Sequence, residues 1–209
     1  MSKITPTLWY DGTAEEAANF YVTLLPDSRI EAVNRSPIDT PSGPAGMVLT
    51  VVFTLAGQRF CGLNGGPQFR HSEAVSFMIE TEDQAETDRL WDAIASNGGQ
   101  PGPCGWIKDR WGLSWQITPK RLLELVTDRD SSRAQRAMQS MMQMSKIDIA
   151  ALERAAAGRR AARSSRPAAP PSLPVHPRSA LVVLVVEVPP VGCLVAPLGG
   201  AVEPLVCAP

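Results

Sequence analysis

The feature that most constrains the fold is a weak internal repeat of about seventy residues within the first 127 residues. Residues 4–10 are strand-like, and a helical pattern beginning near Thr13 follows them. Residues 75–81 are strand-like again, and a second helical pattern follows at the matching distance. Each half therefore carries a strand, a helix and then further strands.

Capping boxes and apolar stripes predict where the two helices begin and which side they bury. Thr13 with Glu16 and Thr81 with Gln84 have the capping-box spacing. An Asn-Gly-Gly sequence at residues 97–99 is typical of the end of the second helix. Apolar residues at helical spacing give each helix a buried face: Ala17, Phe20, Tyr21, Leu24 and Leu25 in the first, and Leu90, Trp91 and Ile94 in the second.

The remaining apolar stretches predict the other strands. They cover residues 29–34, 47–55 and 58–63 in the first half and residues 104–108 and 113–117 in the second. The second half is shorter, so its third strand is left open. A small sheet with one helix leaves an apolar face exposed, and two such halves can bury these faces together. We therefore expect an α+β fold of two tandem βαβββ-type modules, at about 3–66 and 73–127, forming a curved barrel or cleft.

C-terminal helices are expected over residues 119–158, which would complete a single domain spanning residues 1–158. Pro119 suits a first helical position, Asp130 and Asp148 suit N-caps, and Gly158 suits a helix end. A methionine cluster in this region is typical of packing rather than of a cofactor site. We expect these helices to cover the barrel or to contribute to a homodimer contact.

Residues 159–209 differ in composition from the rest of the chain. Every Phe, Tyr and Trp lies between Trp9 and Trp115, whereas ten of the nineteen prolines fall in this tail. Such a Pro/Ala-rich segment predicts disorder or an aberrant extension of the reading frame. Its apolar run, residues 180–186, is much shorter than the ~20 residues of a membrane span, so no membrane partner is expected.

Charge and cysteine usage exclude several classes of protein. The formal net charge is -1, and no basic patch carries interleaved aromatics, which argues against nucleic-acid binding. The four cysteines have neither zinc-site spacing nor the density of a disulfide framework. The N-terminus lacks the pattern of a signal peptide. A cytoplasmic location is therefore expected.

Several motifs carry a resemblance to a known family. The segments "TPTLWYDGTAEEAANFY", "LNGGPQF", "EAVSF", "CGWIKDRWGLSWQI" and "AQRAMQSMMQMSKIDIAALERAAAG" are similar to the PhnB-like branch of the vicinal oxygen chelate superfamily. That superfamily includes glyoxalase, bleomycin-resistance and extradiol dioxygenase proteins. Members of the branch often have the label 3-demethylubiquinone-9 3-methyltransferase. The resemblance covers roughly residues 3–158 and implies a paired-module fold with an internal cleft.

The resemblance also implies positions for a divalent metal ion, usually held by His and Glu. It places these positions at Pro6, Ser76 and Gln116, with another near residues 62–64. Proline has no donor atom, and neutral Ser and Gln side chains bind divalent ions weakly beside carboxylate or imidazole. We therefore expect neither a metal nor another cofactor. No Gly-rich loop follows a strand and opens a long helix, which disfavours an S-adenosylmethionine methyltransferase.

Three tryptophans within "CGWIKDRWGLSWQI" suggest where a ligand would bind. If Gln116 points into the cleft, strand alternation points Ser114 inward as well and Trp115 toward the core. Trp106 is then a ligand-facing candidate, and Trp111 would cover a pocket mouth or a dimer seam. The predicted ligand-binding residues are Tyr10, Asn64, Ser76, Met78, Trp106, Ser114 and Gln116.

The sequence offers no convincing catalytic residue. His71 is either a solvated linker residue, the favoured reading, or an acid/base at a pocket rim. Lys108 and Asp109 flank a turn and are expected to form surface ion pairs rather than to act in catalysis. Cys61 and Cys104 are expected to be inert packing on strands. No Ser/His/Asp or Cys/His triad can be built from these residues.

Three functions are compatible with these observations. The leading hypothesis is a metal-independent protein that binds a small aromatic or hydrophobic ligand. The second is an enzyme of the same fold, with isomerase, lyase or transferase activity, including the methyltransferase of the family label. The third is a homodimeric scaffold without a ligand.

Overall fold

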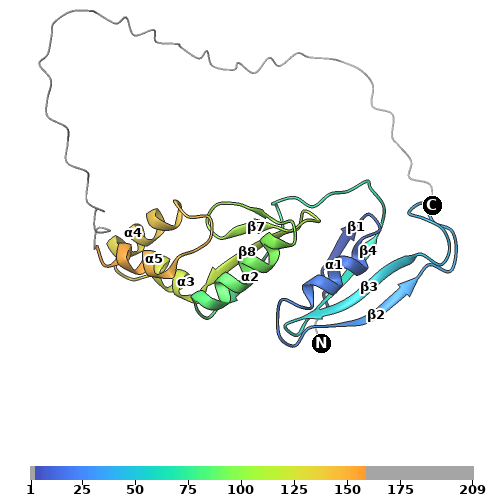
Figure 1. Ribbon diagram of the computed structural model, residues 1–209, viewed down its shortest axis with the longest axis horizontal. Helices are drawn as coiled ribbons and strands as arrows, with labels where there is room; N and C mark the ends of the chain where they lie inside the picture. Colours follow the sequence, from blue (N-terminus) through green and yellow to red (C-terminus); the bar gives the residue numbers. More distant parts are fainter. Residues whose placement is uncertain (1–2, 159–209) are drawn as a thin grey trace, which may run out of the picture. The chain divides into compact units, whose positions relative to one another are not determined.

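The computed structural model describes residues 3–158, which form two β-sheets and five α-helices (Figure 1). The expected α+β class with two modules is confirmed. The predicted tail at residues 159–209 lies outside the described residues. In the part of the chain that the structure describes, no helix has the length and apolar character needed to cross a membrane.

The first module contains four strands and one helix. They are β1 (Thr7–Tyr10), α1 (Ala14–Tyr21), β2 (Arg29–Arg35), β3 (Val48–Leu55) and β4 (Gln58–Asn64). The strand order is β1-β4-β3-β2. Strand β1 pairs with β4 in parallel, and the other pairs are antiparallel. The chain therefore places its first and last strands side by side.

The second module repeats this connectivity. It consists of β5 (Ser76–Thr81), α2 (Gln84–Ser96), β6 (Gln100–Pro101), β7 (Trp106–Lys108) and β8 (Ser114–Pro119), with strand order β5-β8-β7-β6. The strand that the sequence left open is the two-residue β6. Among residues 3–158, no strand of one sheet pairs with a strand of the other. The two sheets therefore do not form a closed barrel.

Each module helix packs on one face of its own sheet and leaves the other face more open (Figure 1). In the first module, Leu8, Tyr10, Val51 and Phe53 are buried. Strand alternation puts a second set on the opposite face, and these side chains are only half-buried: Trp9, Val52, Cys61 and Leu63. We call the two faces without a module helix the open faces.

The same alternation sorts the side chains of β8. Trp115 and Ile117 are buried in the core, and Ser114 and Gln116 lie on the opposite side of the strand. Trp115 is 2 % exposed, which confirms the prediction that it is a core residue.

The N-caps of the two module helices differ from the predicted capping boxes. The Thr13 side chain makes no capping bond, and the Ala14 N–H instead donates to Oδ1 of Asn64 at 2.9 Å. Helix α2 is capped by Asp83, whose carboxylate accepts from the Glu86 N–H at 2.8 Å. Both capping boxes were therefore wrong, because better-placed acceptors satisfy these amides. The predicted caps Asp130 and Asp148 are confirmed.

Three C-terminal helices form a small packed unit of their own. They are α3 (Lys120–Val126), α4 (Ser131–Met141) and α5 (Ile149–Ala156). A separate apolar cluster joins them, with Leu122, Leu125, Ala137, Ile147, Leu152 and Ala156 at its centre. The side chain of Gln84 ties the unit to α2, because it donates to the Ile147 carbonyl and accepts from the Ile149 N–H.

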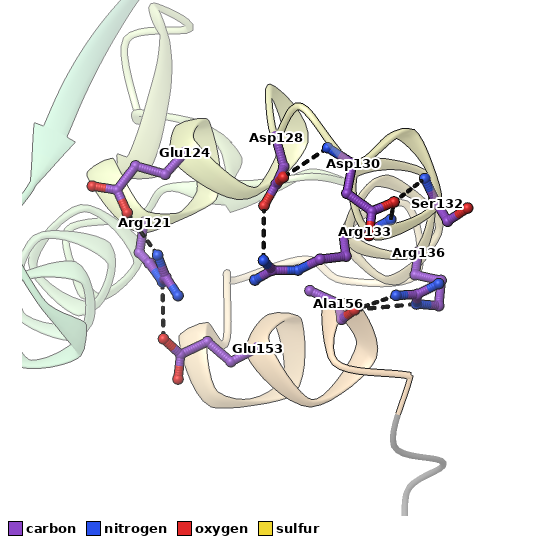
Figure 2. A network of polar contacts seen from close by, with 9 residues as sticks. All are labelled: Arg121, Glu124, Asp128, Asp130, Ser132, Arg133, Arg136, Glu153 and Ala156. Carbon is purple, nitrogen blue, oxygen red and sulfur yellow. Dashed lines mark hydrogen bonds and ion pairs between the residues drawn. The ribbon is translucent and has the colours of Figure 1, made fainter.

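Ion pairs and caps surround this helical unit (Figure 2). Arg121 on α3 donates to Glu124 and to Glu153, and so links α3 with α5. Arg136 on α4 donates to the Ala156 carbonyl at the C-terminal end of α5. A cation at this position complements both the free carbonyls and the helix dipole. The unit is therefore held by polar contacts at its rim as well as by its apolar core.

Candidate functional site

The open face of the second sheet brings five predicted ligand-binding residues together. The β5–β8 and β7–β8 registers place Ser76 opposite Ser114, and both Met78 and Trp106 opposite Gln116. The Gln116 amide donates to the Ser76 hydroxyl at 2.8 Å. These side chains form two adjacent cross-strand rows on one surface.

A cavity of about 500 Å³ adjoins the β7 edge of this face; we call it the Trp106 cavity. Its size lies within the range of small-molecule sites. The lining residues come mainly from β6 and the segment after it, with two prolines, and from β7 and β8. The cavity is lined by Glu73, Gln100, Pro101, Gly102, Pro103, Cys104, Trp106, Ile107, Lys108 and Ser114. It therefore contains Trp106 and Ser114 from the predicted set.

Ser114 is the unusual polar group of the Trp106 cavity. The residue is 1 % exposed, and its hydroxyl oxygen has no hydrogen-bond partner. Buried hydroxyls are normally paired, because an unpaired one loses its hydration without compensation. A ligand with a carbonyl or hydroxyl group could supply the missing hydrogen bond.

An ion pair lies at the edge of the same cavity. The Lys108 ammonium is 2.5 Å from the Glu73 carboxylate. The hydrogen bond from Lys108 lowers the pKa of Glu73. Both side chains are accessible to solvent, so this ion pair is weak and either group can contact a ligand instead. The expectation of a surface ion pair at Lys108 agrees with this geometry.

The other two predicted ligand-binding residues, Tyr10 and Asn64, lie on the buried face of the first sheet. The Asn64 side chain caps α1 and also donates to the Val48 carbonyl at 2.9 Å. Both ends of its amide are thus used within the fold. The Tyr10 hydroxyl lies 3.2 Å from the Tyr21 hydroxyl. The structure therefore separates these two residues from the five on the second sheet.

Asp109 is the residue that sequence reasoning placed wrongly. A surface ion pair was expected, but Asp109 is 3 % exposed and its carboxylate accepts four hydrogen bonds. The donors are the Tyr21 hydroxyl at 2.6 Å, the Trp115 indole at 2.9 Å and the N–H groups of Trp111 and Leu113. Asp109 therefore joins the β7–β8 turn to α1 of the first module.

The buried tyrosines of this network remain in their neutral forms. Burial is the main cause that raises the pKa of Tyr21, and the nearby Asp109 charge acts in the same direction. Burial likewise raises the pKa of Tyr10, although its hydrogen bond with Tyr21 opposes the effect. Both hydroxyls therefore keep their protons and can donate at neutral pH.

The metal positions implied by the family resemblance do not form a fitting donor set. Ser76 and Gln116 meet, but they are neutral and are bonded to each other. Pro6 lies next to β4 and contributes only its backbone carbonyl, which accepts from the Cys61 N–H. Within residues 3–158, no group of three or more His, Cys, Asp or Glu side chains could hold a metal ion. These donors do not suit a divalent cation.

The two cysteines of the described domain differ in their surroundings. Cys61 lies on β4 as expected, and burial raises the pKa of its thiol. Cys104 lies in the turn before β7 rather than on a strand, with a φ of 58°. Its N–H donates to the Met144 carbonyl at 2.8 Å, so the turn is anchored to the segment between α4 and α5.

Comparisons with known proteins place this architecture among its relatives. Residues 2–118 match the sequence model of the family described as 3-demethylubiquinone-9 3-methyltransferase. A PhnB protein from Bacillus cereus is 32% identical, with 56% of this chain and 99% of that chain covered and a TM-score of 0.50. A protein from Pseudomonas aeruginosa is 21% identical, with 57% and 98% covered and a TM-score of 0.47. No curated protein matches the chain.

Proposed function

Because the chain belongs to the 3-demethylubiquinone-9 3-methyltransferase family, which includes PhnB proteins, we propose that it binds a small aromatic or hydrophobic ligand in the Trp106 cavity without a metal ion. The family match confirms the PhnB-like resemblance. The unpaired Ser114 hydroxyl inside this largely apolar cavity is the observation that carries the proposal. Such a group fixes the orientation of a ligand whose remaining surface is apolar.

The aromatic wall supports the same proposal. Trp106 is half-buried and lines the cavity, and a Trp side chain offers a large contact area to a ring. Gly102, whose N–H donates to the Trp106 carbonyl at 2.8 Å, and the two flanking prolines also line the cavity. The rings of Pro101 and Pro103 restrict the backbone of this segment, which lowers the entropy cost of ordering it around a ligand.

We expect Trp106→Ala to weaken binding of N-phenyl-1-naphthylamine, a neutral aromatic probe, by about tenfold or more, because a large apolar contact is lost. Probe fluorescence in a titration measures the dissociation constant. Ile38→Ala is the control, since Ile38 is 66 % exposed and lies outside this cavity. Equal affinities for the wild-type protein and Trp106→Ala would contradict the proposal.

Ser114→Ala provides a second readout in the same experiment. Removing an unpaired buried hydroxyl is expected to leave the free energy of unfolding unchanged or to raise it by up to about 1 kcal/mol. Binding of a ligand that uses the hydroxyl would weaken at the same time. A stabilising substitution that reduces affinity is the behaviour of a site residue rather than of a packing residue.

We also propose that the protein is a homodimer that uses the open faces of its sheets. Met78 is 49 % exposed on β5, and Val75, just before β5, is 60 % exposed. Trp9 and Leu63 on the first sheet are half-buried. Apolar groups gathered on a sheet face favour a second copy of the chain as their cover, since self-association through one patch is the commonest assembly of soluble proteins.

Sedimentation equilibrium tests the homodimer. The wild-type protein is expected at twice the mass of one chain, and Met78→Glu is expected to weaken association by about tenfold or more, because a charge would be buried in the interface. Met138→Glu on α4 is the matched control, since Met138 is exposed away from both sheets. A wild-type monomer at high concentration would refute this part of the proposal.

A methyltransferase is the second candidate, because the description of the family names that activity. Methyl transfer from S-adenosylmethionine needs a site for this cofactor, and the known doubly wound sites use a Gly-rich turn between a strand and a helix. The corresponding turns here are residues 11–13 and 82–83, which contain only one glycine, Gly12. The described residues therefore favour ligand binding over this chemistry.

A further inference from the structure

A second cavity, of about 460 Å³, is lined by residues of the β1–α1 turn, the link after β4 and the β7–β8 turn. We call it the junction cavity. Trp9, Phe69 and Trp111 give it aromatic walls, and Asp11, Arg70 and His71 are among its polar groups. It shares only Lys108 with the Trp106 cavity. The two cavities can therefore be tested separately.

His71 presents an unused nitrogen in this cavity. Its side chain is half-buried, its ring packs edge-on against Tyr10 at 5.4 Å, and its Nε2 atom is buried without a partner. A hydrogen bond with the Trp9 backbone raises the pKa of His71, so the imidazole is the donor in that bond. Nδ1 must be the donating atom, because Nε2 has no partner. The neutral ring thus leaves the Nε2 lone pair free.

Burial is nevertheless the largest influence on His71. It lowers the pKa of the imidazole, whereas the charge of Asp109 and the Trp9 bond raise the pKa. The ring of the free protein is therefore neutral at pH 7 and above. A negative charge brought close to Nε2 would favour the protonated ring, since an opposite charge stabilises the charged form.

The charged groups around His71 favour an anion. Lys108 and Arg110 pair with Glu73 and Glu16, which lie outside the set of lining residues, and such exposed pairs contribute little. Arg70 has no ion-pair or hydrogen-bond partner within residues 3–158. Asp11 is the one acidic residue that lines the cavity in this part of the chain. Three cations therefore face a single carboxylate.

The aromatic walls favour a flat ring. Trp9 and Phe69 meet edge-to-face at 5.0 Å, and the Trp9 indole is fixed by a 2.7 Å hydrogen bond to the Gly66 carbonyl. Phe69 is 67 % exposed despite this contact. Trp111 is held by Arg110, whose guanidinium carbon lies 4.6 Å from the centre of its ring. Fixed aromatic faces of this kind bind planar apolar groups at low entropy cost.

We infer that the junction cavity binds a small aromatic carboxylic acid as its anion, with the ring against Trp9, Phe69 and Trp111 and the carboxylate on Arg70 and His71. Binding takes up a proton at Nε2, which then donates to a carboxylate oxygen. Affinity consequently rises as pH falls from 8 toward 6. It declines again only near the pKa of the acid itself, at about 4. This site goes beyond the proposed function, because it lies in a separate cavity.

Calorimetry with 1-naphthoate at pH 6 and pH 8 tests the inference, with uncharged 1-naphthamide as the matched probe. We expect naphthoate to bind about tenfold more tightly at pH 6, with proton uptake visible as a dependence on the buffer's ionisation enthalpy. His71→Gln keeps a donor for the Trp9 carbonyl but cannot titrate, so it should remove the pH dependence. Arg70→Gln should weaken naphthoate about tenfold at both pH values and leave naphthamide unchanged.

Trp106→Ala separates this site from the proposed ligand site. Unchanged naphthoate binding in that variant supports the junction cavity, and a loss there would overturn the inference by moving the anion to the other cavity. The chain has two histidines, so the imidazole NMR signals missing from His71→Gln identify His71 directly. Absence of any shift in those signals with millimolar benzoate, salicylate and 1-naphthoate would also overturn it. Urea unfolding midpoints of His71→Gln and Arg70→Gln that equal the wild-type value would exclude misfolding as the cause of their binding changes.

Discussion

Replacing Asp109 with alanine is expected to lower the free energy of unfolding by about 4 kcal/mol or more, because four donors, three of them buried and one half-buried, lose their acceptor. The Tyr21 hydroxyl, the Trp115 indole and two backbone N–H groups all donate to this carboxylate. Solvent cannot easily take the place of the lost carboxylate, since Asp109 is 3 % exposed. Asp109 also has no ion-pair partner in the described part of the chain. Equilibrium urea unfolding, followed by tryptophan fluorescence, measures the loss.

Two milder variants remove only part of the hydrogen bonding around Asp109 and should lower the free energy of unfolding by less. Asp109→Asn keeps the shape of the side chain but replaces one acceptor oxygen with an NH₂ group. If Oδ2 is replaced, the rotatable Tyr21 hydroxyl can accept from this group, whereas the Trp115 indole can only donate. Tyr21→Phe removes one donor and should cost about 1–2 kcal/mol. The expected order of destabilisation is therefore Asp109→Ala, then Asp109→Asn, then Tyr21→Phe.

The energetic importance of Asp109 follows from its position between the modules. Tyr21 comes from α1 of the first module, and Trp115 from β8 of the second. Trp111, on the same turn as Asp109, packs edge-on against the Tyr21 ring at 5.5 Å. A stability of Asp109→Ala within about 1 kcal/mol of the wild-type protein would show that this contact between modules is dispensable.

The repeat made most of the fold predictable, and the reason is physical. Each half has to bury an amphipathic helix on a small sheet, so the order of apolar stretches fixes the order of elements. Both halves indeed share one connectivity. Strand β6 could not be predicted, because it has two residues and one of them is Pro101. So short an element carries no recognisable periodicity.

The face that each strand presents was predictable only where its two sides differ in polarity. On β8, Ser114 and Gln116 alternate with Trp115 and Ile117, and the predicted orientation of Trp115 is confirmed. On β1, Leu8 and Tyr10 on one side and Trp9 on the other are all largely apolar. The pattern does not say which side packs on the helix, and only the tertiary structure shows Tyr10 buried there.

Tertiary partners also explain the features that local patterns missed. Asn64 caps a helix that begins 50 residues earlier in the chain, and no spacing rule reaches so far. Asp109 was expected at the surface because acidic residues in turns are usually solvated. The four donors that the fold brings around Asp109 offset the energetic cost of burying its carboxylate. The segment "CGWIKDRWGLSWQI" contains Asp109, but the resemblance did not show its role.

The second large effect is expected at Gly105, where two kinds of strain combine. The residue has a φ of +83°, and a Cβ atom there would lie 2.9 Å from the Ile117 carbonyl oxygen and 3.1 Å from the Ile147 side chain. Its N–H donates to the Ser145 carbonyl at 2.7 Å, and its own carbonyl accepts from the Ile117 N–H at 2.9 Å. Gly105 is thus the point where the second sheet meets the segment before α5.

Gly105→Ala is therefore expected to cost about 3–4 kcal/mol, from a left-handed backbone that disfavours a side chain and from an overpacked contact with rigid backbone. Gly112→Ala separates the two causes, because Gly112 has nearly the same φ, +88°, but open space around the added Cβ. It should cost only about 1–2 kcal/mol. Urea unfolding of both variants measures the difference. Equal losses would mean that the backbone conformation alone, rather than the close approach of Ile117, requires glycine at position 105.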